Sequence, residues 1–149
     1  MTHQTANTDF GGGPLAWHRV LQVSRLVLRE LDRRLDDEQR IGVNEFDVLI
    51  TLDNAPDRRL RMTDLAEAVM LSSGGLTRLV GRLEQRGFVE RQQDPSDARS
   101  FHATLTADGA QRLAQARVTH DAVIEELVSS RLTTREVDSL AQALGRVVQ

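Results

Sequence analysis

The chain has 149 residues, about the length of one domain, and its 40% hydrophobic and 28% charged residues are typical of a folded globular protein rather than a disordered one. It contains no cysteine, which excludes disulfides, thiol catalysis, cysteine-based zinc sites and thiol redox sensing. No run of about 18 uncharged apolar residues occurs, and the first residues lack a secretion signal. We therefore expect no membrane contact and a cytoplasmic location.

The distribution of charge is more informative than the total. All 19 basic residues are arginines and the net charge is −3. A G+C-rich coding bias explains the missing lysine, but each cation is still a planar guanidinium group suited to bidentate contacts with phosphate and guanine. Residues 58–99 hold eight arginines and six acidic residues, whereas the rest of the chain holds eleven and sixteen. The middle of the chain is therefore its basic part.

Two helices are predicted before residue 57. Residues 1–14 are polar and glycine-rich, and we expect them to form a mobile leader. From residue 15 to about residue 37 apolar residues recur at helical spacing, which predicts the first helix. Gly42 ends the segment that connects the first helix to the second. Asn44 is expected to cap this second helix, with Asp47 in its first turn. The segment Asn54-Ala-Pro-Asp57 ends that helix.

A short helix and a longer one follow. Thr63 is expected to cap the short helix, and its predicted buried residues are Leu65, Ala66, Val69 and Met70. Ser72 and Ser73 are expected to cap the longer helix, which reaches Arg86 and stops at Gly87. The apolar stripe of this helix consists of Leu76, Leu79, Val80 and Leu83.

Two short strands are predicted next, over residues 88–93 and 101–105. Residues 94–100 join them and are too many for a tight two-residue turn. His102, on the second strand, is expected to face solvent. The fold class is thus mainly α with a small β-hairpin.

The last third of the chain is helical. Thr106 caps a long helix with Asp108 in its first turn. A helix running to about residue 130 spans roughly 36 Å, which exceeds the width of so small a domain, so part of it needs another partner. Thr133 and Glu136 form a capping box for the final helix. Its apolar stripe comprises Val137, Leu140, Ala141, Leu144 and Val148.

A short helix, a turn and a second helix form a helix-turn-helix, and a hairpin directly after it makes a winged version. The exposed face of the recognition helix is predicted to carry Ser73, Gly74, Thr77, Arg78, Gly81 and Arg82. Thr77 and Arg78 are suited to base edges, because arginine to guanine is the commonest specific contact. Gly74, in the first turn, allows close approach of the backbone to phosphate. The alternative interpretation is a solvated helix face with ordinary arginines.

The loop between the strands adds an arginine at the hairpin tip. Arg99 is placed to enter the minor groove, where negative potential is concentrated. Asp97, two residues earlier, is expected to hold the guanidinium in one rotamer. The alternative is a solvated turn, since Asp-Pro-Ser-Asp is favourable turn chemistry in any protein.

Residues 62–106 closely resemble the MarR family of bacterial transcription regulators. The segment Asp97-Ala-Arg99 followed by Leu105-Thr106 is the specific part of the match. The matching pieces are Asp64-Leu-Ala66, Leu71-Ser-Ser-Gly-Gly-Leu-Thr-Arg78, Leu83-Glu-Gln-Arg-Gly-Phe-Val-Glu-Arg91, Asp94-Pro-Ser-Asp-Ala-Arg99 and Leu105-Thr106. The outer helices fit as well, so the resemblance covers about residues 15–148.

The resemblance implies a homodimeric winged-helix repressor. Residues 15–149 would form a single regulator domain, with dimerisation helices at about 15–38 and 107–149 and a DNA-binding lobe at about 44–106. Such a dimer would bind a pseudo-palindromic operator in double-stranded DNA, with half-sites about one helical turn apart. The residues expected to bind DNA are Ser72, Ser73, Gly74, Thr77, Arg78, Arg82, Asp97 and Arg99.

Regulators of this family often respond to small anionic or aromatic effectors, so the resemblance also implies release by a ligand. Trp17 and His18 are the candidate ligand contacts. Trp17 resembles the tryptophan of the urate-responsive branch, and its alternative role is an anchor in the dimer core. The four histidines are scattered along the chain, which argues against a metal site, and no cofactor is expected.

Two other functions compete with this interpretation. An enzyme is disfavoured because there is no P-loop, no dinucleotide-binding motif after a strand, no His-Glu-x-x-His and no cysteine nucleophile. A winged-helix dimer that acts only through protein contacts is the second alternative. It would not need Arg78, Arg82 and Arg99 on one surface.

Overall fold

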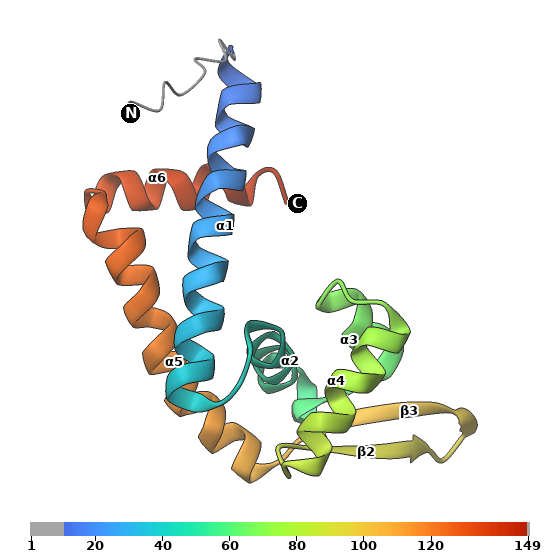
Figure 1. Cartoon of the computed structure of the whole chain (residues 1–149). Helices are drawn as coiled ribbons and strands as arrows, with labels where there is room; N and C mark the ends of the chain where they lie inside the picture. The colour runs from blue at the N-terminus through green and yellow to red at the C-terminus, as the bar shows by residue number, and fades with distance from the viewer. Residues whose placement is uncertain (1–10, 149) are drawn as a thin grey trace, which may run out of the picture.

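The structure, a computed structural model, describes residues 11–148 and confirms a mainly helical fold with a small sheet (Figure 1). Residues 1–10 of the predicted leader lie outside this range. The elements in chain order are α1 (Gly12–Gln39), α2 (Val43–Asn54), η1 (Pro56–Arg58), β1 (Arg59–Arg61), α3 (Met62–Ala68), α4 (Ser73–Gln85), β2 (Val89–Asp94), β3 (Asp97–Leu105), α5 (Ala107–Leu127), η2 (Ser129–Arg131) and α6 (Thr134–Gly145).

Three of the predicted helix caps are confirmed. The hydroxyl of Ser72 accepts a hydrogen bond from the backbone N–H of Gly75 at 3.1 Å and begins α4. Thr106 does the same for Gly109 at 3.0 Å and begins α5. Thr133 and Glu136 form the capping box of α6. Each cap satisfies a backbone donor that the first turn of a helix leaves free.

Other helix boundaries differ from the prediction. Helix α1 begins at Gly12, so residues 12–14 of the predicted leader are helical. Helix α2 is preceded by Gly42, whose N–H donates to the Glu45 side chain at 3.0 Å, so Asn44 is not its cap. Helix α3 begins at Met62, before the expected cap, and α5 ends at Leu127 rather than near residue 130.

The sheet is larger than predicted. It has three antiparallel strands in the order β1-β3-β2, and the sequence pattern does not predict β1, which pairs with β3. The ribbon of β2 and β3 extends until Asp94 pairs with Asp97, so the turn is the tight two-residue one that the sequence analysis excluded. One carboxylate oxygen of Asp94 accepts from the backbone N–H (2.8 Å) and hydroxyl (2.6 Å) of Ser96, which reverses the chain.

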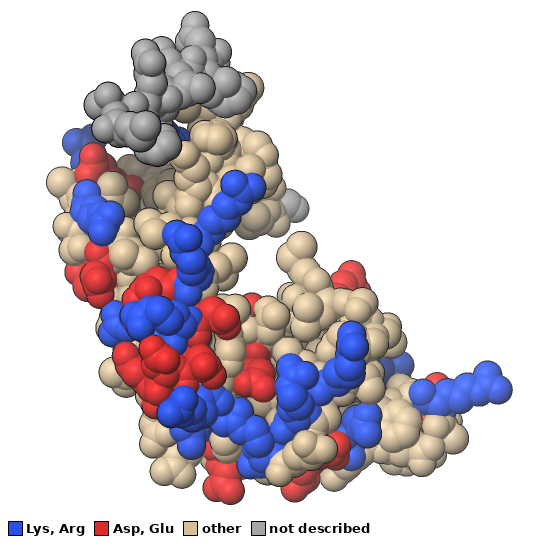
Figure 2. Space-filling view, in the orientation of Figure 1, with Lys and Arg blue, Asp and Glu red and all other residues tan. Residues whose placement is uncertain are grey.

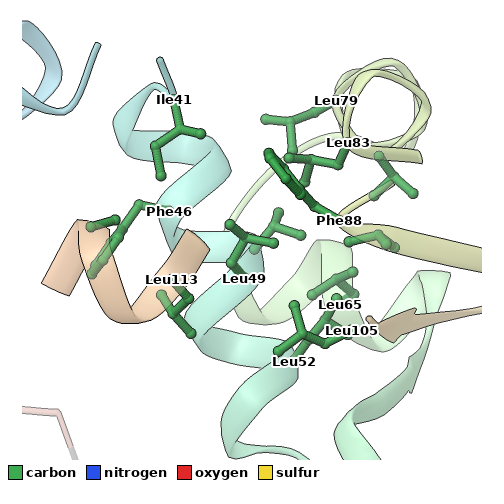
Figure 3. Packing of buried hydrophobic residues seen from close by; sticks show 14 of the residues in the cluster. Ile41, Phe46, Leu49, Leu52, Leu65, Leu79, Leu83, Phe88, Leu105 and Leu113 are labelled. Carbon is green, nitrogen blue, oxygen red and sulfur yellow. The ribbon is translucent and has the colours of Figure 1, made fainter. Parts of the chain in front are cut away.

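The hydrophobic core surrounds α2, in the lobe that α2, α3, α4 and the sheet form, and it continues onto α1 and α5. Figure 3 shows Leu49 and Leu52 of α2 surrounded by side chains from α3, α4, α5 and the sheet. Fully burying a leucine stabilises a fold by about 1.5–3 kcal/mol, so this cluster fixes the position of α4 against α2. Met70, by contrast, is 91% exposed; it lies in the turn after α3 at φ 55° rather than in the core.

The helices outside the lobe leave much apolar surface exposed. Helix α1 packs along α5 (Figure 1), yet its earliest buried residue is Val27. Helix α6 has no buried residue among those described, and Leu140 and Leu144 remain 43% and 40% exposed. No helix between residues 11 and 148 has the length and apolar character needed to cross a membrane.

Candidate nucleic-acid interface

Helix α4 presents the predicted polar face to solvent. Its buried side consists of Leu76, Leu79, Val80 and Leu83. Ser72, Ser73, Gly74, Thr77, Arg78 and Arg82 are all exposed. The hydroxyl of Thr77 donates to the carbonyl oxygen of Ser73 at 2.8 Å. Helix α3, the turn and α4 thus form the predicted helix-turn-helix, with the second helix free along one side.

The two arginines on this face differ in their surroundings. Arg78 forms no ion pair with any residue of the described range, so its guanidinium is available to a partner. Arg82 Nε lies 3.8 Å from Glu45 Oε1, and Arg86 Nη1 lies 3.5 Å from Glu45 Oε2. The Glu45 side chain is only 12% exposed, so it draws Arg82 toward the lobe. Of the two arginines, Arg78 is the better placed for base contacts.

Arg99 and Asp97 lie at the end of the wing, but their relation differs from the prediction. Asp97 Oδ1 accepts a hydrogen bond from the backbone N–H of Arg99 at 3.0 Å. No ion pair joins the two side chains in the described structure, so Asp97 does not hold the Arg99 rotamer. Instead it shapes the turn, and the Arg99 guanidinium extends freely from it.

The prediction that His102 faces solvent is wrong. Its side chain is 15% exposed, and Nδ1 lies 3.7 Å from Asp94 Oδ2 without a hydrogen-bond partner. Arg61 Nη2 lies 3.7 Å from the same oxygen. The hydrogen bonds from Ser96 lower the pKa of the Asp94 carboxyl below its ordinary value. A charged cluster thus anchors the wing, and sequence reasoning missed it because the pattern places Asp94 in a loop.

The predicted effector residues are not part of this face. Trp17 and His18 lie in the N-terminal part of α1, which projects away from the lobe (Figure 1). The Trp17 side chain is 62% exposed. Within residues 11–148, no three His, Asp or Glu side chains gather in a way that could hold a metal ion.

The charges of the lobe are arranged asymmetrically. Figure 2 shows basic side chains over α4 and out to the end of the wing, whereas basic and acidic side chains are mixed beside α1 and α5. The chain's net charge of −3 therefore hides a locally positive face. Such a face is the electrostatic signature of a protein that contacts phosphates.

An exposed recognition helix, a wing beside it and a basic surface define a winged helix-turn-helix protein. A sequence model of the MarR family matches residues 41–101, which span the region from α2 into the wing. Together with the relatives described next, this match shows that the chain belongs to the MarR family of transcription regulators.

The relatives are bacterial regulators. The transcriptional regulator HosA of Escherichia coli is 34% identical over 133 residues, covering 89% of this chain and 94% of HosA. The transcriptional repressor MprA of E. coli is 28% identical over 137 residues, covering 88% and 77% of the two chains. Among solved structures, the MarR family regulator Sco3205 of Streptomyces coelicolor, in complex with DNA, matches with a TM-score of 0.80 and 32% identity, over 91% of this chain and 85% of Sco3205.

Proposed function

We propose that this chain is a homodimeric repressor that binds specific double-stranded DNA and is released by a small molecule. The observation that carries the DNA proposal is the exposed face of α4, where the Thr77 and Arg78 side chains lie in solvent and Arg78 forms no ion pair within residues 11–148. The wing adds Arg99 for the minor groove. The DNA complex of Sco3205 and the repressor name of MprA support the proposal, and binding to the chromosome would place the protein in the cytoplasm.

The uncovered apolar surface supports the homodimer. Helix α6 and α1 up to its first buried residue, Val27, expose a set of large apolar side chains, namely Trp17, Val23, Leu26, Leu140 and Leu144. A second copy related by a two-fold axis would cover both surfaces at once. It would also present two recognition helices to one face of the duplex, which calls for a pseudo-palindromic operator.

The DNA proposal is tested by selection from a pool of random duplexes, followed by affinity measurements at increasing salt. With roughly six to ten phosphate contacts per dimer, affinity should fall about 10³-fold or more between about 50 and 200 mM salt. Enrichment of one inverted repeat is the expected result. A flat salt dependence without enrichment would favour the second candidate, a dimer that acts only through protein contacts.

The effector proposal has a built-in optical probe. Trp17 is the single tryptophan of the chain, so its fluorescence reports on the surface it occupies. If Trp17 contacts an aromatic carboxylate, titration of that compound should quench the emission and release the DNA. Trp17→Phe should then abolish the release of DNA by that compound while the dimer persists. If Trp17 is instead a dimer anchor, a larger truncation, Trp17→Ala, should weaken the dimer.

A further inference from the structure

A hollow lies between the start of α3, the recognition helix and the wing. Its volume is about 390 Å³. The polar residues around it include three arginines and three hydroxyl groups, namely Arg61, Arg91, Arg99, Thr63, Thr77 and Ser100. Asp97 is the acidic residue among those that line it. The lining therefore carries an excess of positive charge together with neutral hydrogen-bond donors, a combination suited to an oxyanion.

Neighbouring residues orient the side chains of Arg61 and Arg91 but leave their N–H donors available to a ligand. Arg91 Nε lies 3.8 Å from Glu84 Oε2, and its guanidinium carbon lies 5.5 Å from the centroid of the Phe101 ring. Arg61 Nη2 lies 3.7 Å from Asp94 Oδ2. Both ion-pair distances exceed the roughly 2.7–3.2 Å of a hydrogen bond. No hydrogen bond within residues 11–148 uses the guanidinium of Arg61 or Arg91, so a bound oxyanion can accept from both.

The position of the hollow indicates which oxyanion it receives. In a duplex, one sugar–phosphate strand separates the major groove from the neighbouring minor groove. With α4 in the major groove and the wing in the minor groove, that strand must pass between α4 and the wing. The hollow lies on this path, because residues of both α4 and the wing line it. A free phosphate ion has the same chemistry, and competition with inorganic phosphate separates the two sources.

We propose that the hollow binds the phosphodiester groups of the strand that separates the two grooves, with Arg91 and Arg61 as its phosphate contacts. The inference rests on the proposed function and adds two residues to the DNA interface. These contacts set the register of α4 on the duplex without reading its sequence. Arg91 and Arg61 should therefore affect operator and random DNA alike, unlike a residue that contacts base edges.

The test replaces one operator phosphate at a time with a neutral methylphosphonate. Wild-type protein should lose affinity at one or two adjacent positions in each half-site. Arg91→Gln should bind unmodified DNA more weakly than wild type does. A methylphosphonate at those positions should lower the affinity of the variant little further, because its side chain no longer offers the phosphate a positive charge. Its salt slope should fall by about 0.9 for each phosphate that the variant leaves unneutralised. Arg91→Lys, which keeps the charge, should retain most of the slope.

Two further variants make the result independent of one substitution. Arg61→Gln should repeat the pattern of Arg91→Gln at the same or a neighbouring phosphate. Arg29→Gln removes an equal charge from α1, outside the lobe, and should leave both the phosphate pattern and the slope unchanged.

Three outcomes would overturn the inference. If every methylphosphonate weakens Arg91→Gln and Arg61→Gln as much as wild type, neither arginine contacts a phosphate. If millimolar inorganic phosphate at constant ionic strength displaces DNA from wild type but not from Arg91→Gln, the hollow is a site for a free anion. If wild-type protein selects no duplex at all, the proposed function fails with it, a result distinct from the first two.

Discussion

Gly109, at the start of α5, provides the sharpest test of how the lobe is joined to the outer helices. Its N–H donates to Thr106 Oγ1 at 3.0 Å, and the same hydroxyl donates to the carbonyl oxygen of Gly87 at 2.6 Å. A Cβ at position 109 would overlap the carbonyl oxygen of Phe88 and lie 2.8 Å from Leu105 Cδ1. Non-bonded carbons need about 3.5–4.0 Å. Gly109→Ala therefore forces the start of α5 away from the chain segment after α4.

We expect Gly109→Ala to lower the free energy of unfolding by about 3 kcal/mol, the upper part of the usual range for overpacking. The upper part applies because the overlapping atom belongs to the backbone, which cannot rotate away as a side chain can. That loss is a large fraction of the total stability of a domain, about 5–15 kcal/mol. The measurement is urea unfolding followed by circular dichroism at one fixed protein concentration, because oligomer stability depends on concentration.

Gly81→Ala is the matched control for this substitution. Nothing lies within 4 Å of a Cβ at this position in α4, so alanine should stabilise the helix by about 0.5–1 kcal/mol. The two glycine substitutions should thus have opposite signs. If Gly109→Ala unfolds at the wild-type urea concentration, the packing of α5 against Phe88 is not tight and the reasoning fails.

Other consequences follow for DNA binding, assembly and pH. Arg78→Ala should lower the binding free energy by about 1–3 kcal/mol on the operator and by much less on random DNA, whereas Arg99→Ala should weaken binding to both DNAs by similar factors. Binding isotherms on both DNAs measure these losses. Equal losses for Arg78→Ala together with a lost sequence preference for Arg99→Ala would show that the two roles are reversed. Leu140→Asp should place an uncompensated charge in the dimer interface and dissociate or unfold the protein, and a stable wild-type monomer in sedimentation at micromolar concentration would disprove the assembly. The lowered pKa of Asp94 means that its carboxylate stabilises the fold above the ordinary value of about 3.9 and that this contribution is lost as pH falls through the lowered pKa. Wild type should therefore lose more stability than Asp94→Asn between about pH 5 and 3 in acid denaturation, and equal losses would contradict the role of the Ser96 hydrogen bonds.

The sequence predicts helix starts where the signal is local. The hydroxyls of Ser72, Thr106 and Thr133 each accept from a donor three residues away, so the cap is visible in a short window. The same reasoning misplaces the start of α2, because a side chain of another helix accepts a hydrogen bond from a backbone N–H of its first turn. Asp32 of α1 accepts the N–H of Val43 at 3.0 Å, an interaction that no pattern around Asn44 reveals.

The full extent of the sheet and the charged cluster could not be predicted because they depend on distant pairing. Strand β1 has three residues and exists through its pairing with β3, where Arg61 lies opposite His102. That pairing brings both side chains to Asp94 and removes His102 from solvent. The exposed face of α4 was predictable, because helical periodicity alone assigns Arg78 to it. The ion pair between Glu45 and Arg82 was not predictable, because Glu45 belongs to another helix.

The contacts between α2 and α5 determine how an effector could act on the proposed dimer. Arg117 Nη2 lies 3.1 Å from Asp53 Oδ2, and the rings of His120 and Phe46 stack with centroids 4.8 Å apart. These contacts hold the lobe and α5 together, so the spacing of the two recognition helices should change through the dimer interface rather than through a hinge inside one chain. The chain lacks cysteine, so spin labels can be attached at single introduced sites. Labels at Gly81→Cys of both copies should change their separation on effector binding, whereas labels at Gly81→Cys and Gln115→Cys within one copy should not. A change within one copy would show that the lobe turns on α5 and that these contacts break.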